Sequence, residues 1–322
     1  MVSRKSFKRK SQIRSGISVK SQKKRELWRR NIPLILMSLP AVTLMFMFTY
    51  MPKFGLILAF KDYNYVDGLL GSAWNGLENF KYVFASGDVW VAVRNTVLYH
   101  TANVFVLHFI ALLLAIMLYV VSKKSAKRYQ FVISMPYLVS MNIIASVVYI
   151  FLRYDGGIVN SLRDMMGMEA IGWYITPKIW PFLLVFVNTW FGAGIKSVYY
   201  YSIFMGIDQT LFEAISIDGG GAWCKFRHVM WPAVTPILCL FTITEMGHLL
   251  SSSLALYHAV PMDSSALYKV TEVLATYEYH GLQMGNIGTT AALGLVVGVV
   301  QLIAVQALNS IVKKVSPGNE MY

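Results

Sequence analysis

Ionisable and hydrogen-bonding side chains inside long apolar segments are the residues of this sequence that could do chemistry. Glu245 and His248 lie three residues apart, so they share one face if the segment is a helix. Such groups are costly at membrane depth and usually face a cavity or one another. Together with Asn142, Asn188 and Trp190 they predict a polar path through a helix bundle. Two alternatives stay open, because Glu245 and His248 can also pair with each other or hold neighbouring helices together.

The same residues offer no support for catalysis or for a metal site. A single Glu–His pair lacks a third ligand, and the six histidines show no metal-ligand spacing. Glu213 and Asp218 are isolated acids, which argues against a membrane-embedded synthase or glycosyltransferase. The chain also has no G-x-x-x-x-G-K-[ST] phosphate loop. In the nearest string, at 192–197, isoleucine and not glycine stands directly before Lys196. We expect the Lys196 ammonium to reach the inner interface of the membrane.

The elements that must position these residues are membrane-spanning helices. The chain is 56% hydrophobic and only 14% charged, against about 25% charged residues in soluble proteins. Several apolar runs reach the roughly 20 residues that cross a bilayer. The sequence therefore predicts an all-α integral membrane protein with about six transmembrane helices. Their expected ranges are 33–51 (with a possible extension to 60), 89–121, 130–152, 179–204, 237–257 and 287–312.

Charge distribution predicts the orientation and the domain limits. Residues 1–30 hold twelve Lys and Arg against one acid, so most of the net charge of +13 lies there. Beside a membrane span, such a run marks the cytoplasmic side, although nucleic-acid binding is an alternative. We expect a basic cytoplasmic tail at 1–30, a transmembrane domain at 31–315 and a cytoplasmic tail at 316–322. Both termini would then be cytoplasmic, and Cys224 and Cys239 would be reduced.

A polar stretch at about 207–236, between the fourth and fifth spans, has marked start and stop signals. Thr210 and Glu213 have the spacing of a capping box, which predicts a helix to about residue 217. Gly219 and the two glycines after it would end that helix. A second short helix, 222–230, would close at Pro232, and Pro236 would open the next span. A helix of the predicted helix–hinge–helix would suit docking into a groove on a partner protein.

The stretch resembles the EAA loop of permease subunits of type I ABC importers. That pattern is Glu-Ala-Ala, three residues later Asp-Gly, then an aromatic residue and a Pro-x-x-x-Pro exit. Two departures are visible, Ile215 in place of alanine and Trp231 in place of leucine. Stretches 50–55, 59–63, 76–80 and 276–281 are similar to permeases that import oligosaccharides and polysaccharides. The matching positions are Glu213, Ala214, Ile215, Asp218, Gly219, Phe226, Pro232 and Pro236.

The resemblance implies a non-enzymatic subunit of the bacterial cytoplasmic membrane that forms half of a translocation path for oligosaccharides or polysaccharide fragments. It implies a second, homologous permease, two cytoplasmic ATPases that bind ATP and Mg²⁺, an extracytoplasmic solute-binding protein and a lipid bilayer as partners, with no nucleic acid and no cofactor in this chain. An importer for amino acids or phosphate is an alternative, and an ion-coupled secondary transporter is another. The residues implied in ATPase coupling are Glu213, Ala214, Ile215, Asp218, Gly219, Phe226 and Pro232.

Overall fold

The computed structural model describes residues 31–315, without the side chains of residues 308 and 311–315. The two tails expected at 1–30 and 316–322 lie outside the described residues. The chain divides into two units between Ile57 and Leu58. Within the described residues, five helices are long and apolar enough to cross a membrane, and a sharply bent pair of helices makes a sixth candidate. The predicted all-α membrane fold is confirmed.

The first candidate span covers Asn31–Phe60, so the extension past Pro52 is present. The winding of the helix changes around that proline. A π-helical turn, η1 (Phe46–Tyr50), precedes it, and a 3-10 segment, η2 (Met51–Phe60), contains it. Proline has no N–H and its ring crowds the carbonyl four residues earlier, which explains why regular α-helical winding stops here.

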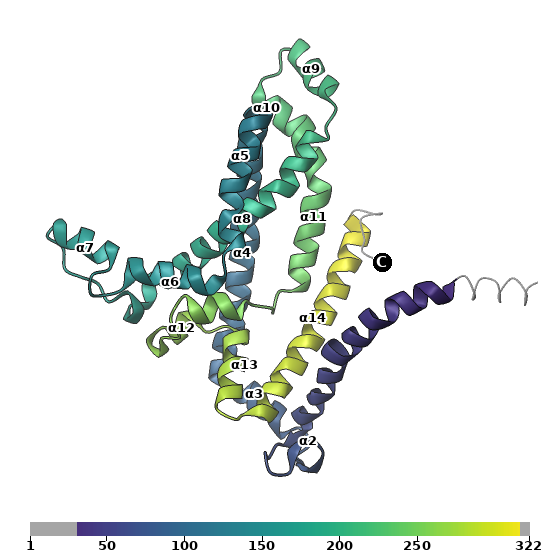
Figure 1. Ribbon diagram of the computed structural model, residues 1–322, viewed down its shortest axis with the longest axis vertical. Coiled ribbons are helices and arrows are strands. Elements are labelled where there is room, and N and C mark those ends of the chain that lie inside the picture. The colour runs from purple at the N-terminus through teal and green to yellow at the C-terminus, as the bar shows by residue number, and fades with distance from the viewer. Residues whose placement is uncertain (1–30, 316–322) are drawn as a thin grey trace, which may run out of the picture. The chain divides into compact units, whose positions relative to one another are not determined.

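Two long helices, α4 (Gly87–Val120) and α8 (Trp180–Met205), pack side by side through the second unit (Figure 1). Small residues at the contact let their backbones approach, as is common between membrane helices. Gly192 faces Leu107 of α4, and Gly194 allows an equally close approach to a third helix, because a Cβ there would clash with the carbonyl of Ile133 on α5 (Lys123–Ser134).

The third predicted span is wrong as one continuous helix over 130–152. Helix α5 continues into a 3-10 turn, η3 (Met135–Leu138), and the chain then bends by 92° into α6 (Met141–Leu152). Pro136 lies in η3, and Val139 is extended between the two helices, with φ −93° and ψ 141°. Helix α7 (Ile158–Met165) and two short 3-10 turns, η4 (Trp173–Ile175) and η5 (Pro177–Ile179), lead on to α8.

The fifth predicted span, 237–257, is also misplaced. One helix runs over Ala222–Gly247 and comprises α10 (Ala222–Lys225), the π-helical turn η6 (Phe226–Met230) and α11 (Trp231–Gly247). Pro232 therefore does not close a short helix, and Pro236 lies inside α11. The π turn explains the continuity, because such local rewinding accommodates the hydrogen bond that a proline cannot make.

The remaining short elements gather at one end of the long helices, and α9 (Gln209–Ile217) and α10 lie at the other end (Figure 1). Side-chain hydrogen bonds from α4 hold the end that is opposite α9. Asn95 donates to the carbonyl of Glu272 at 2.8 Å, and Tyr99 donates to the carbonyl of Val270 at 2.6 Å. The elements at that end are β1 (Lys61–Asp62), α2 (Gly68–Gly71), β2 (Ala73–Trp74, antiparallel to β1), α3 (Glu78–Ala85), η7 (Ala255–Ala259), η8 (Ser265–Leu267), α12 (Tyr268–Thr271), α13 (Leu274–Gln283) and the start of α14 (Ile287–Val315).

Candidate functional site

A polar cavity of about 280 Å³ lies among α4, α8, the end of α11 and the chain that follows it. Its lining combines imidazole, amide, hydroxyl and charged groups, which are unusual neighbours inside apolar helices. Three of the five residues predicted for a polar path, Asn188, Glu245 and His248, are brought together here. The other polar lining residues are Thr96, His100, Asn103, His108, Lys196, Ser251, Ser252, Ser253 and Tyr257.

An ion pair between α8 and α11 neutralises the two formal charges in this cavity. Lys196 Nζ lies 2.9 Å from Glu245 Oε1, and the two side chains are only 25% and 35% exposed. The ammonium also lies 4.7 Å from the ring centroid of Phe241. The expectation that Lys196 reaches the membrane interface is therefore wrong. The negative charge of Glu245 on α11 holds the Lys196 ammonium inside the helix bundle.

Two buried polar atoms in the cavity lining have no hydrogen-bond partner within the described part of the chain. They are His100 Nε2 and Asn103 Oδ1. The amide nitrogen of Asn103 is used, since it donates to Tyr257 Oη at 3.2 Å. Buried polar groups are nearly always paired with protein, water or ligand. These two atoms are therefore positions at which a polar solute or water can bind.

His100 is a site residue that sequence reasoning missed, although a signal was present. Thr96, His100 and His108 recur at multiples of four along α4 in an otherwise apolar segment, which puts them on one helix face. His108 is fixed by Tyr200, whose hydroxyl lies 2.6 Å from Nδ1, and it stacks on Phe241 with ring centroids 6.0 Å apart.

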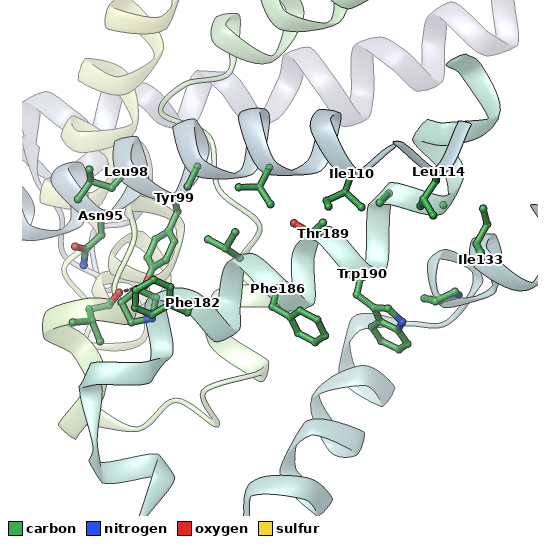
Figure 2. A pocket seen from close by; sticks show the side chains of 18 of the residues that line it. Asn95, Leu98, Tyr99, Ile110, Leu114, Ile133, Phe182, Phe186, Thr189 and Trp190 are labelled. Carbon is green, nitrogen blue, oxygen red and sulfur yellow. Dashed lines mark hydrogen bonds between the residues drawn. The ribbon is translucent and has the colours of Figure 1, made fainter. Parts of the chain in front are cut away.

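Two predicted path residues lie elsewhere. Asn142 is exposed at the start of α6 and lines neither described cavity. Trp190 lines a larger cavity of about 1210 Å³ between α4, α5 and α8 (Figure 2). Asn188 and Trp190 are two residues apart on α8, so they cannot face the same way. The helical register, which a span prediction leaves open, explains the split.

The predicted helix–hinge–helix begins two residues earlier than its capping box implied. Asp208, not Thr210, is the N-cap of α9, and its carboxylate accepts from the Thr210 N–H at 3.0 Å. That backbone hydrogen bond holds the pKa of the exposed Asp208 carboxyl below its usual range. The Thr210–Glu213 capping box is therefore wrong, because an aspartate cap satisfies the same orphan N–H groups. Glu213 is left exposed on the helix surface.

The hinge after α9 is a Schellman turn at the predicted glycines. Gly219 has φ +76°, the left-handed conformation that glycine adopts without strain. Its N–H donates to the Ser216 carbonyl at 3.2 Å, and the Gly220 N–H donates to the Ile215 carbonyl at 2.8 Å. A Cβ on Gly220 would also crowd the Ile215 side chain. The turn therefore fixes the direction in which the chain leaves α9.

One face of α9 is anchored to the end of α4, and the other is exposed. Phe212 is buried against Tyr119, with ring centroids 5.8 Å apart, and Gln209 donates to Tyr119 Oη at 3.1 Å. Ile217 is 86% exposed, and Trp223, at the start of the next helix, is 69% exposed. These apolar residues form an exposed surface beside Glu213 on a helix whose position is fixed. Leu211, 51% exposed, is the remaining large apolar residue of this surface.

Phe226, another predicted coupling residue, packs against Trp223 of this surface. It is half-buried, and its ring lies between Trp223 at 5.5 Å and Trp231 at 6.1 Å between centroids. Trp231 is the departure from the EAA pattern noted in the sequence. Its indole ring packs beside Phe226, where a leucine would offer a smaller side chain without a ring.

Comparison with known proteins places this geometry in a family. No protein-family model matches the chain. The polygalacturonan/rhamnogalacturonan transport system permease protein YteP of Bacillus subtilis (strain 168) is 29% identical over 283 residues, 87% of this chain and 88% of that protein. A chain of a bacterial ABC transporter involved in the import of the acidic polysaccharide alginate superposes with a TM-score of 0.81 at 26% identity, over 90% of this chain and 99% of that one. The chain is an ABC-importer permease.

The same alginate importer in complex with an alginate pentasaccharide-bound periplasmic protein gives a second match. Its chain has a TM-score of 0.80 and 26% identity over 89% of the permease and 96% of its own length. The family expected from residues 213–236 is thus confirmed over nearly the whole chain. Transport permeases are not enzymes, in agreement with the absence of a catalytic motif from the sequence.

The larger cavity of the permease is apolar. Phe182, Phe186 and Trp190 follow one another at four-residue intervals along α8 and line it (Figure 2). Among the described residues of its lining, Arg94, near one end, is the only formally charged side chain. Few hydrogen-bonding groups face this space, so the smaller polar cavity is the better candidate for a path that carries a hydrophilic solute.

A half-buried acid outside the spans gives the permease a pH-dependent stability. Burial raises the pKa of Glu278, on α13, from 4.5 to about 7. Because the folded chain then holds this proton more tightly than the unfolded chain, the free energy of unfolding falls as pH rises from about 4.5 to about 7.

We expect Glu278→Gln to raise the thermal unfolding midpoint at pH 8 and to raise it much less at pH 5. The gain at pH 8 is at most about 3 kcal/mol, because one pKa unit corresponds to about 1.4 kcal/mol. Unfolding of the detergent-purified permease at both pH values checks this. Glu169→Gln, at an exposed acid, is the control. Equal shifts at pH 5 and pH 8 would contradict the expectation.

Proposed function

We propose that this permease is a membrane subunit of an ATP-driven importer for oligosaccharides or polysaccharide fragments and forms half of the translocation path. The observation that carries the proposal is the polar cavity, with its unpaired His100 Nε2 and Asn103 Oδ1, in a chain that superposes on an alginate importer over 90% of its length. Sugar hydroxyls both donate and accept, so a lining of amides, imidazoles and serines suits them.

The exposed surface of α9 is the proposed contact with a cytoplasmic ATPase. Glu213, Ala214 and Ile215 lie on this helix, and the turn at Gly219 fixes its direction. ATP and Mg²⁺ would be bound by two such partner subunits, because this sequence has no phosphate-binding loop. A second, homologous permease would complete the path, and an extracytoplasmic solute-binding protein would deliver the sugar.

The placement of basic residues supports this orientation. Helix α9 contacts Tyr119 at the end of α4, and Lys123 and Lys124 follow that end directly. Clusters of Lys and Arg near span ends mark the cytoplasmic side. The α9 end would therefore be cytoplasmic together with both termini, and the end with α13 would face outward in a bacterial cytoplasmic membrane.

The ion pair bears on the alternative of a proton-coupled transporter. A proton relay in such a transporter would use Glu245 together with His248, but the Glu245 carboxylate is bound to Lys196 at 2.9 Å. A charge-assisted bond to an ammonium engages the carboxylate that such a relay would need, which leaves His248 without its expected partner. Import of an amino acid or phosphate by an ABC system is the nearest alternative. The uptake test distinguishes it from sugar import, because each substrate is offered to the same reconstituted importer.

Uptake by proteoliposomes that contain the permease, its partner permease and both ATPases tests the proposal. With binding protein outside and ATP inside, we expect oligosaccharide uptake that survives a protonophore and stops without ATP. Asn103→Leu should reduce uptake and leave assembly intact, because it removes a hydrogen-bonding group from the cavity. Uptake that ignores ATP and collapses with the proton gradient would overturn the proposal, and uptake of amino acids or phosphate instead would reassign the substrate.

A further inference from the structure

Two histidines and an aspartate converge among η7, the turn that follows it and α13. Helix α13 lies at the end of the long helices opposite α9 (Figure 1). His258 belongs to η7, Asp263 to the turn after it, and His280 to α13. His280 Nε2 lies 2.8 Å from Asp263 Oδ1, and His258 Nε2 lies 3.4 Å from Asp263 Oδ2. One ligand atom from each residue lies within 4.8 Å of the other two. The group was not predicted from the sequence, because the two histidines are far apart in the chain and no motif spacing links them.

The backbone around Asp263 is held in an unfavourable conformation that places its carboxylate between the two rings. Met262 and Asp263 have φ of 55° and 50°, in the left-handed region that residues other than glycine seldom adopt. The turn is closed by the Asp263 N–H, which donates to the His258 carbonyl at 3.1 Å. Such strain persists only where the surroundings impose it, and it concentrates at functional sites.

Further side chains orient the three residues from outside. Glu272 Oε1 lies 3.2 Å from His280 Nδ1, and the Tyr268 hydroxyl donates to Asp263 Oδ1 at 3.0 Å. A histidine whose other ring nitrogen faces a carboxylate is the usual arrangement around metal-binding imidazoles, because it fixes the tautomer and the ring orientation. Glu272 therefore directs Nε2 of His280 toward Asp263.

The group is accessible from one side and enclosed on the other. The side chain of His280 is 10% exposed, whereas those of His258 and Asp263 are 31% and 36% exposed. An ion can therefore enter from solvent and meet a preformed ligand at the back. Tyr279 packs edge-on against His258 with ring centroids 4.8 Å apart and limits the freedom of the more exposed ring.

We propose that His258, Asp263 and His280 bind a divalent transition-metal ion, with zinc as the best match. Two imidazole nitrogens and one carboxylate oxygen are zinc ligands at about 2.0–2.2 Å, and tetrahedral coordination puts them about 3.3–3.6 Å apart. Small rotations of the side chains reach that spacing from the distances given above. The fourth position is left for water or for a group from a docking partner. Bound metal would join the segment after α11 to α13.

Metal binding by the full-length chain, purified in detergent and stripped with a chelator, tests the proposal. After equilibrium dialysis against micromolar zinc, elemental analysis should find about one ion per chain. His258→Ala and Asp263→Asn should each lose it. His228→Ala is the matched control, because it removes a histidine that lies beside Cys224 at the other end of the molecule. That variant should keep the ion.

Two further measurements separate metal binding from a purely structural role of the group. Cobalt in place of zinc should give the intense visible absorption of a tetrahedral site in the wild type and not in His258→Ala. Glu272→Gln should weaken zinc binding by about 10–100-fold, the usual effect of removing the outer partner of a ligating histidine. The proposal is overturned if the wild type retains no zinc, or if it and folded His258→Ala, checked by its thermal unfolding midpoint, retain the same amount.

Discussion

Transport is expected to stop in Gly219→Val while the protein still inserts into the membrane. Gly219 has φ +76°, and a β-branched side chain in that conformation costs about 1–3 kcal/mol locally. The Schellman turn would open, and α9 would lose the fixed direction that the turn gives it. Uptake in reconstituted importers, set against the amount of assembled protein, measures the effect. We expect uptake to fall at least about tenfold, the equivalent of about 1.4 kcal/mol.

Gly221→Val is the matched control for that variant. Gly221 has φ −80°, and no atom lies within 4 Å of the position that a Cβ would take, so the same side chain meets neither strain nor crowding two residues away. Its uptake should stay close to that of the wild type. Glu213→Ala extends the test to the exposed face of α9 and should weaken co-purification of the ATPase. Normal uptake and normal ATPase recovery in both Gly219→Val and Glu213→Ala would remove α9 from the coupling contact.

Breaking the Lys196–Glu245 ion pair is expected to destabilise the bundle strongly. Glu245→Gln would leave the Lys196 ammonium between helices without its counter-charge. Removing one partner of a buried pair costs about 3–5 kcal/mol, and the partial exposure of these side chains puts the expected loss at about 2–3 kcal/mol. The unfolding midpoint of the purified chain in detergent should fall accordingly, and uptake should fall with it.

The exchange Lys196→Glu with Glu245→Lys tests whether the charges or the individual side chains matter. If attraction between α8 and α11 is the cause, the double variant should recover a large part of the stability lost by Glu245→Gln. The two charges are not coupled if the double variant loses as much unfolding free energy as Lys196→Glu and Glu245→Lys lose together when measured singly. Glu169→Gln, at an exposed acid outside the spans, controls for the loss of a negative charge in Glu245→Gln.

Periodicity and hydropathy predicted the long helices well because a membrane imposes length and composition on each span. The expected spans at 89–121 and 179–204 differ by few residues from α4 and α8. The hinge at Gly219 was also predictable, since positive φ selects glycine at that position. In each of these cases the determining interactions are local in the chain.

What could not be predicted depends on contacts between distant segments. Lys196 and Glu245 are 49 residues apart, and neither sequence neighbourhood reveals that the other charge is near. The unbroken helix through Pro232 runs against the local signal of that proline, because π-helical rewinding accommodates it. The break at Val139 was missed although Pro136, three residues before it, is a local signal for one. Trp190 lines a different cavity from Asn188 for a simpler reason. Its span was right, but the rotation of α8 about its own axis was unknown.

The helix from Ala222 to Gly247 is unbroken, so a movement at its α10 end is carried along it to Glu245. From Trp223 to Glu245 it is about 33 Å long at 1.5 Å per residue. A tilt of about 10° at the α9 end would move the Glu245 end by about 6 Å, more than the carboxylate can follow while it stays bonded to Lys196 on another helix. Such a tilt would therefore break the ion pair and free α11 from its bond to α8.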